Sequence, residues 1–148
     1  MTGKSAFTDE EWKLIREGPP LAGLIVITAE GGGTFRETFA MARAYTDARK
    51  QHGESELLDE LVSAGPERGP RYHSSAEVRE RGFQLLGEAA EVLQRKATPE
   101  EVEDYRKFVI TLSEKVAEAH KEEGERVSER ERAAIDEIST SLSPAAAS

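Results

Sequence analysis

Two carboxylates flank a run of glycines in the segment Ala29-Glu30-Gly31-Gly32-Gly33-Thr34-Phe35-Arg36-Glu37. Glycine permits close approach of the backbone, and the start of a following helix presents free amides that suit an anion. The flanking side chains, Glu30 and Glu37, instead suit a hard divalent cation such as Ca²⁺, Mg²⁺ or Mn²⁺. This segment is therefore the first candidate metal site. The alternative is an interhelical turn in which Glu37 only caps the next helix.

A second acidic turn, over residues 119–128, is the other candidate. It contains Glu122, Glu123 and Glu125, and Glu131 follows it; all four could supply oxygen ligands. Lys121 and Arg126 reduce the negative charge of this turn, and its alternative interpretation is a solvated charged loop. We take Glu30, Glu37, Glu122 and Glu131 together as the candidate metal ligands.

Other chemistries find little support in the sequence. The chain has no cysteine, which excludes disulfides, thiolate zinc sites, iron–sulfur clusters and thiol catalysis. No Gly-Lys-Ser/Thr follows the glycine run, so it is not a P-loop for nucleotide phosphates. His52, His73 and His120 are scattered, and no nucleophile elbow is visible. We expect no catalytic residue and no cofactor other than a divalent cation.

The elements that would position these turns are helices, and their starts share one signature. A Ser or Thr is followed three residues later by Glu, so that the hydroxyl and the carboxylate cap the helix start reciprocally. The pattern occurs five times, at Thr8/Glu11, Thr34/Glu37, Ser74/Glu77, Thr98/Glu101 and Ser128/Glu131.

Apolar periodicity after these signatures predicts an all-α, compact bundle of six or seven helices. The expected helices are Thr8–Glu17, Pro20–Glu30, Thr34–Gln51, Ser55–Ala64, Ser75–Lys96, Pro99–Glu122 and Glu129–Leu142. A break is expected at Gly18-Pro19. We expect residues 1–148 to form one domain with disordered ends at about 1–6 and 143–148.

The segment Leu21–Ala29 is ambiguous, because its consecutive β-branched residues would also suit a strand. No second segment reads as a strand, and a lone strand cannot satisfy its backbone groups. We interpret it as a short helix that is apolar on all sides because it lies in the middle of the bundle.

The chain also shows a faint internal repeat. A shift of 90 places Thr8 on Thr98, while a shift of 94 places Thr34 on Ser128. Each half would then consist of an apolar helix, an acidic turn and a capped acidic helix. The alternative is that helical periodicity alone produces the match.

This layout resembles the TerB-like, tellurite-resistance-associated helical domains, which carry an Ala-Asp-Gly turn followed some residues later by Glu. Ala29-Glu30-Gly31 and Glu37 match in the first half, with Glu in place of Asp; the second half has only Glu122, Glu123 and Glu131 near the equivalent places. The resemblance covers about residues 8–51 and 98–142 and implies divalent-metal binding. Short strings such as Val116-Ala117-Glu118-Ala119 also resemble small uncharacterised bacterial helical proteins.

The charge balance bears on partners. The formal net charge of −9 disfavours nucleic acid and anionic lipid and favours cations or basic protein surfaces. With no signal-peptide pattern and no apolar run long enough for a membrane span, we expect a cytoplasmic protein without membrane insertion. The leading hypothesis is a non-enzymatic module acting through protein contacts or self-association, tuned by a cation. The alternative is an enzyme or small-ligand receptor with a pocket between the helices.

Overall fold

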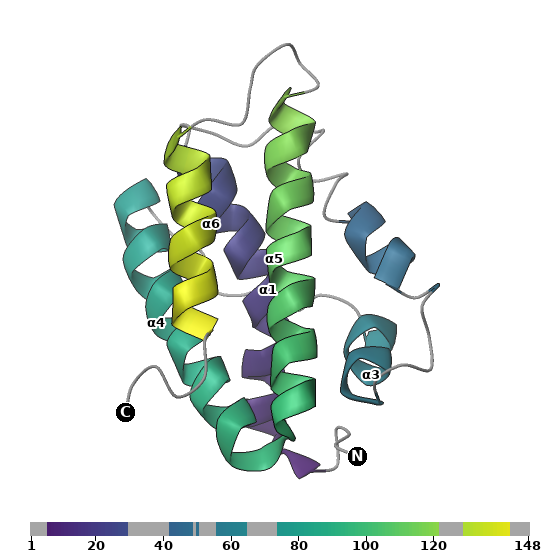
Figure 1. Cartoon of the computed structure of the whole chain (residues 1–148). Helices are drawn as coiled ribbons and strands as arrows, with labels where there is room; N and C mark the ends of the chain where they lie inside the picture. Colours follow the sequence, from purple (N-terminus) through teal and green to yellow (C-terminus); the bar gives the residue numbers. More distant parts are fainter. Residues whose placement is uncertain are drawn as a thin grey trace.

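The computed structural model describes residues 6–29, 42–48, 50, 56–64, 74–121 and 129–142, and these form an all-α bundle (Figure 1). Residues 42–48 are helical, and no residue in these ranges belongs to a strand, so the predicted fold class is confirmed. The other helices are α1 (Asp9–Ala29), α3 (Glu56–Ala64), α4 (Ser75–Lys96), α5 (Pro99–Lys121) and α6 (Glu129–Leu142).

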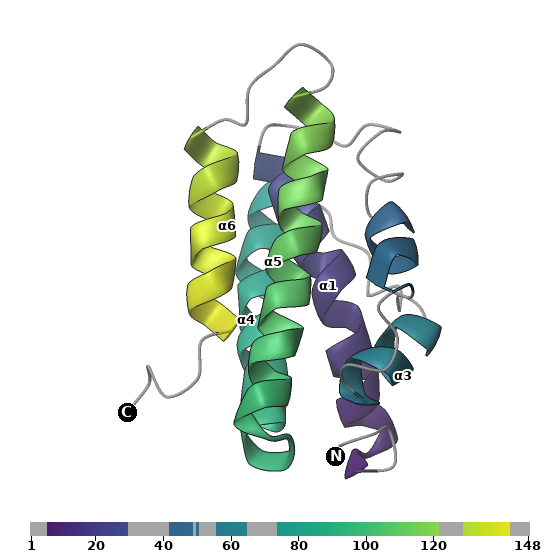
Figure 2. The same ribbon diagram turned by 45° about the vertical axis from the view of Figure 1, so that its right-hand side comes forward.

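The long helices surround α1. α1 and α5 run in the same direction through the bundle, while α4 and α6 run in the opposite direction (Figures 1 and 2). α1 packs against α4, α5 and α6, and has fewer contacts with α3. α3 and the helical stretch 42–48 lie to one side of this bundle in both views.

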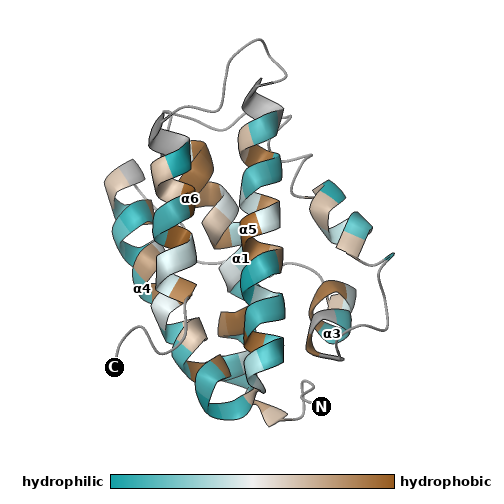
Figure 3. Cartoon of the chain, viewed as in Figure 1, coloured by the Kyte–Doolittle hydropathy of each residue, from teal (hydrophilic) through white to brown (hydrophobic). Residues whose placement is uncertain are grey.

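The core follows the apolar periodicity of the sequence. On α5, Val102, Tyr105, Val109, Leu112 and Val116 recur every three or four residues and are buried. The outer faces of the helices are largely hydrophilic (Figure 3). Helices that bury one stripe and solvate the other face gain most of their stability from this packing. The large aliphatic side chains that are fully buried are Ile15, Leu57, Leu61, Leu86, Leu93, Leu112, Ile138 and Leu142.

The predicted division of residues 8–30 into two helices is wrong. α1 runs without interruption from Asp9 to Ala29, with Pro19 and Pro20 inside it. The fixed φ of proline is close to the helical value, so two prolines can continue a helix if the loss of their N–H groups is offset. A neighbouring helix supplies that offset for Pro19, as the site geometry below shows.

The interpretation of Leu21–Ala29 as a helix is confirmed, and its surroundings explain its composition. Leu21, Ala22, Ile25, Val26 and Ile27 are all buried, because α4, α5 and α6 cover different sides of α1. α4 approaches especially closely at Gly82, where a Cβ atom would lie 2.7 Å from the Ile25 Cδ1 atom.

Polar contacts tie the side layer to the bundle. Arg16 of α1 donates to the Ala64 carbonyl at the end of α3, over 3.1 Å. Such a contact places a cation at the negative end of the helix dipole. Residues 42–48 are held on α5 by the Lys115–Asp47 ion pair, at 2.6 Å, and by the edge-on packing of Tyr45 on Phe108.

Two further arginines fasten α6 to its neighbours. Arg79 of α4 pairs with Glu137 of α6, and its guanidinium also lies over the Phe83 ring. Arg106 of α5 donates to the Ser139 hydroxyl at 2.6 Å and to the Ser139 carbonyl at 3.4 Å. Side-chain contacts therefore reach α6 from both α4 and α5.

Candidate functional site

The predicted metal ligands lie at or beyond the limits of what the structure describes. Glu30, Glu37 and Glu122 fall outside the described residues, and Glu131 lies in α6 with an undescribed side chain. Within the described ranges, no group of three or more His, Asp or Glu residues is placed to hold a metal ion. The cation site at these four glutamates remains a prediction.

The described helix ends nevertheless relate the two acidic turns to each other. α1 ends at Ala29 and α5 ends at Lys121, each directly before one of the acidic segments in the sequence. α6 begins at Glu129. These three helix ends lie at the same end of the bundle (Figures 1 and 2).

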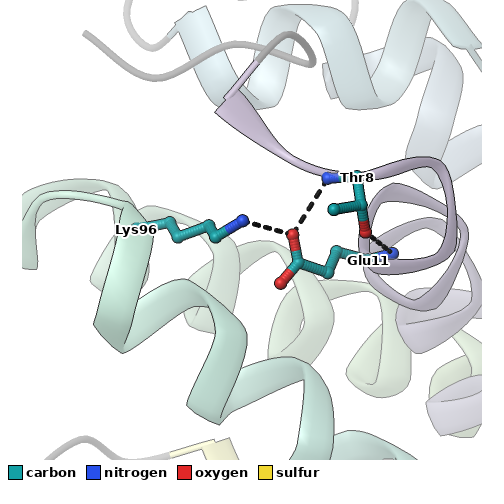
Figure 4. A network of polar contacts seen from close by, with 3 residues as sticks. All are labelled: Thr8, Glu11 and Lys96. Atoms are coloured by element: carbon teal, nitrogen blue, oxygen red, sulfur yellow. Dashed lines mark hydrogen bonds and ion pairs between the residues drawn. The ribbon is translucent and has the colours of Figure 1, made fainter.

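The opposite end of the bundle holds a polar cluster that the structure describes fully, at the start of α1 (Figure 4). The Thr8 amide donates to the Glu11 carboxylate at 2.9 Å, and the Glu11 amide donates to the Thr8 hydroxyl at 3.1 Å. Lys96, the last residue of α4, reaches across to the same Glu11 carboxylate. The capping box predicted at Thr8 is confirmed, and it also joins α1 to α4.

Electrostatics in this cluster favour the ionised carboxylate. The hydrogen bond from Lys96 is the largest cause that lowers the pKa of Glu11 below its ordinary value of 4.5, followed by the bond from the Thr8 backbone. A carboxylate with a lowered pKa is a poor proton donor or acceptor at neutral pH. Glu11 is therefore suited to fastening helices and not to acid–base catalysis.

The second capping box lies at the start of α5 and is less exposed. The Thr98 amide donates to the Glu101 carboxylate at 3.0 Å, and the Glu101 amide donates to the Thr98 hydroxyl at 3.1 Å. Glu101 is buried. At α4, the Ser74 hydroxyl accepts from the Glu77 amide at 3.1 Å, so three of the five predicted caps are confirmed. The caps at Thr34 and Ser128 lie outside the described residues.

Next to these capping boxes, the buried Tyr105 joins the parallel helices α1 and α5. Tyr105 of α5 donates its hydroxyl to the Ile15 carbonyl of α1 at 2.7 Å. In a helix without proline, the Ile15 carbonyl would accept from the N–H of residue 19, but Pro19 has no N–H. The tyrosine hydroxyl therefore supplies the hydrogen bond that the proline removes.

Gly18 makes room for this bridge. A Cβ atom at residue 18 would lie 2.0 Å from the Tyr105 hydroxyl oxygen and 3.3 Å from its Cζ atom. Burial, followed by the electrostatic effect of Tyr45, raises the pKa of Tyr105 well above its ordinary value of 10.0. The hydroxyl thus stays protonated and remains a donor throughout the physiological range.

The polar role of Tyr105 was not predicted from the sequence. The signal was present, because a proline at position 19 in a helix leaves the carbonyl four residues earlier without its usual partner. The identity of the new partner was hidden, since it lies ninety residues away in sequence.

No protein family, curated protein or solved structure matches this chain. Among the described helices, none is both long enough and apolar enough to cross a membrane.

Proposed function

We propose that this chain is a non-enzymatic cytoplasmic module that acts through contacts with another protein. In this proposal, Glu30, Glu37, Glu122 and Glu131 bind a divalent cation that orders the acidic end of the bundle. The TerB-like resemblance of the sequence belongs to the same proposal, because that family's acidic residues are implicated in metal binding.

The observation that carries the cation part is the shared location of two helix C-termini. Those of α1 and α5 lie at the same end of the bundle (Figure 1). Helix C-termini present partial negative charge, and the last turn of α1 contains no basic residue to balance it. A cation near both helix ends would be stabilised by these carbonyl groups as well as by the glutamates.

The interior of the described bundle favours a structural role for its buried polar groups. Tyr105 donates to the Ile15 carbonyl, and Ser113 donates to the Val109 carbonyl at 2.9 Å. Glu101 caps α5, while the carboxylate of buried Glu17 lies 3.9 Å from the Lys13 ammonium. Because these groups are already engaged in contacts within and between the helices, we assign function to the hydrophilic outside of the module.

Thermal unfolding of the full chain tests the cation part. After treatment with a chelator, Ca²⁺, Mg²⁺, Mn²⁺ and Zn²⁺ are added separately. A cation at about 100 times its dissociation constant stabilises by about 2.7 kcal/mol, which raises the melting temperature by several degrees. We expect one cation to produce this shift and the Glu30→Gln/Glu37→Gln variant to abolish it.

The control is Glu88→Gln/Glu91→Gln, which removes two exposed carboxylates from α4. This variant has the same charge change and should keep the shift. If no cation alters the melt of the unmodified protein, the metal site is wrong. If a cation shifts all three proteins equally, it binds elsewhere.

Sedimentation measurements test the contact part. The full chain is examined over a range of concentrations, with and without the cation that shifts the melt, and then with candidate basic partner proteins. Cation-dependent association with a basic partner or with itself would support the proposal. Catalytic turnover of a small molecule by the monomer would favour the competing enzyme hypothesis.

A further inference from the structure

Two consecutive backbone hydrogen bonds of the helical pattern cannot form in α1. Pro19 cannot donate to the Ile15 carbonyl, and Pro20 cannot donate to the Arg16 carbonyl. Gly18 precedes them and adds backbone freedom at the same place. The helix is thus intrinsically weakest between its two halves, Asp9–Gly18 and Pro20–Ala29.

The two halves differ in how they are held. The second half is enclosed, with Ala22, Ile25, Val26 and Ile27 buried on several sides. The first half has an outer side that is exposed at Asp9, Glu10 and Lys13. Because this half is covered on fewer sides, it can separate from the bundle at lower cost than the enclosed half.

Side-chain contacts join the first half to α3, α4 and α5. Its Glu11 pairs with Lys96 of α4, its Arg16 reaches the end of α3, and its Ile15 carbonyl accepts from Tyr105. Among these three contacts, the one from Tyr105 acts directly at the backbone hydrogen bond that Pro19 removes. It is also the buried one, since Tyr105 is 1% exposed.

We propose that the N-terminal half of α1, Asp9–Gly18, is a hinged segment that opens at Gly18-Pro19-Pro20, and that the Tyr105 hydroxyl of α5 is the latch that holds it closed. Opening swings out Trp12 and Ile15 together and uncovers the apolar surface of α4 and α5 beneath them. In this arrangement, α1 remains one continuous helix as long as its first half packs against α5.

A double-mutant cycle tests the latch. Tyr105→Phe removes the hydroxyl and leaves a buried carbonyl without its partner, so the folding equilibrium constant should fall roughly tenfold. Pro19→Ala restores an N–H that can donate to Ile15. In the Pro19→Ala background, Tyr105→Phe should therefore cost much less, and this non-additivity is the signature of a shared acceptor.

Pro20→Ala is the matched control, because its restored N–H faces the Arg16 carbonyl and not that of Ile15. Tyr105→Phe should cost as much in this background as in the unmodified protein. Equal losses in all three backgrounds would show that the hydroxyl does not replace the Pro19 N–H, and the latch would be overturned.

Amide hydrogen exchange on the same variants tests the hinge. We expect Tyr105→Phe to accelerate exchange over residues 12–18 roughly tenfold more than over residues 23–29, because local opening requires the latch to break. Both Pro19→Ala and Pro20→Ala should slow exchange over residues 12–18. If Tyr105→Phe accelerates both halves of α1 to the same extent, opening is global and no hinge exists.

Discussion

α1 and α5 begin alike and then differ. Each starts with a Thr-x-x-Glu capping box of nearly identical geometry, and the two helices run in the same direction. Beyond the first turns, α5 is an ordinary amphipathic helix with a buried stripe and an exposed face. α1 carries Gly18, Pro19 and Pro20 and is enclosed by its neighbours.

The difference shows how a central helix can tolerate residues that would end a peripheral one. An interior proline costs about 3 kcal/mol in a helix that has only its own hydrogen bonds. In α1, burial on several sides favours the helix, and Tyr105 satisfies the carbonyl that Pro19 leaves open. α5 keeps its own backbone hydrogen bonds, and its Tyr105 also replaces one of the two that the prolines remove from α1.

The largest effect is expected from filling the space at Gly18. Gly18→Ala would place a Cβ atom 2.0 Å from the Tyr105 hydroxyl oxygen, so the tyrosine must move and its hydrogen bond is lost. Overpacking and the unsatisfied carbonyl together should lower the free energy of unfolding by at least about 2 kcal/mol. Urea unfolding of the full chain measures this change.

Gly87→Ala is the control for helix propensity. A Cβ atom at Gly87 would meet no heavy atom within 4 Å, so alanine should stabilise α4 by up to about 1 kcal/mol. Similar changes in stability for both glycine variants would contradict the close approach of Tyr105 to α1.

The next largest effect is expected at the two capping boxes, which should differ in how much they contribute to the free energy of unfolding. The box at Thr98 is partly buried and includes the buried Glu101, whereas the box at Thr8 is exposed. Thr98→Ala should therefore cost about 2 kcal/mol of unfolding free energy and Thr8→Ala about 1 kcal/mol. Chemical denaturation of both variants checks the order, and a larger loss at Thr8 would reverse this part of the comparison.

The smallest effect concerns the exposed tie between α1 and α4. Because the pKa of Glu11 is lower in the folded protein than its ordinary value of 4.5, its contribution is present above about pH 4.5. The contribution is lost as the pH falls through the lowered pKa. The difference in unfolding free energy between the unmodified protein and Lys96→Gln should therefore shrink as the pH falls below about 4.5.

Arg95→Gln is the matched control, since Arg95 also lies in the last turn of α4 and shares its helix-dipole position. Its effect should not follow the titration of Glu11. A pH-independent difference for Lys96→Gln, measured by denaturation at a series of pH values, would remove the role of the Glu11 pairing.

Local features of the fold could be predicted from the sequence, because they depend on residues close together in the chain. The bounds of α4 and α6 are those predicted, and the caps at Thr8, Ser74 and Thr98 form as expected. Each cap requires only two side chains three residues apart.

Long-range contacts could not be predicted in the same way. The sequence indicates that Pro19 disrupts the ladder, but only the packing of α5 on α1 reveals that Tyr105 repairs it. The pairing of Lys96 with Glu11 likewise depends on where α4 ends relative to α1. The cation site at the four glutamates stays a prediction, because their side chains lie outside what the structure describes.

Native-state hydrogen exchange of the unmodified protein tests the central claim most directly. The comparison is between residues 12–18 of α1 and residues 102–108 of α5, which lie at equivalent distances from their capping boxes. We predict that residues 12–18 exchange through a local opening with a lower free energy than global unfolding, while residues 102–108 exchange only with the whole domain. Equal protection of the two segments from hydrogen exchange would contradict a hinge in α1.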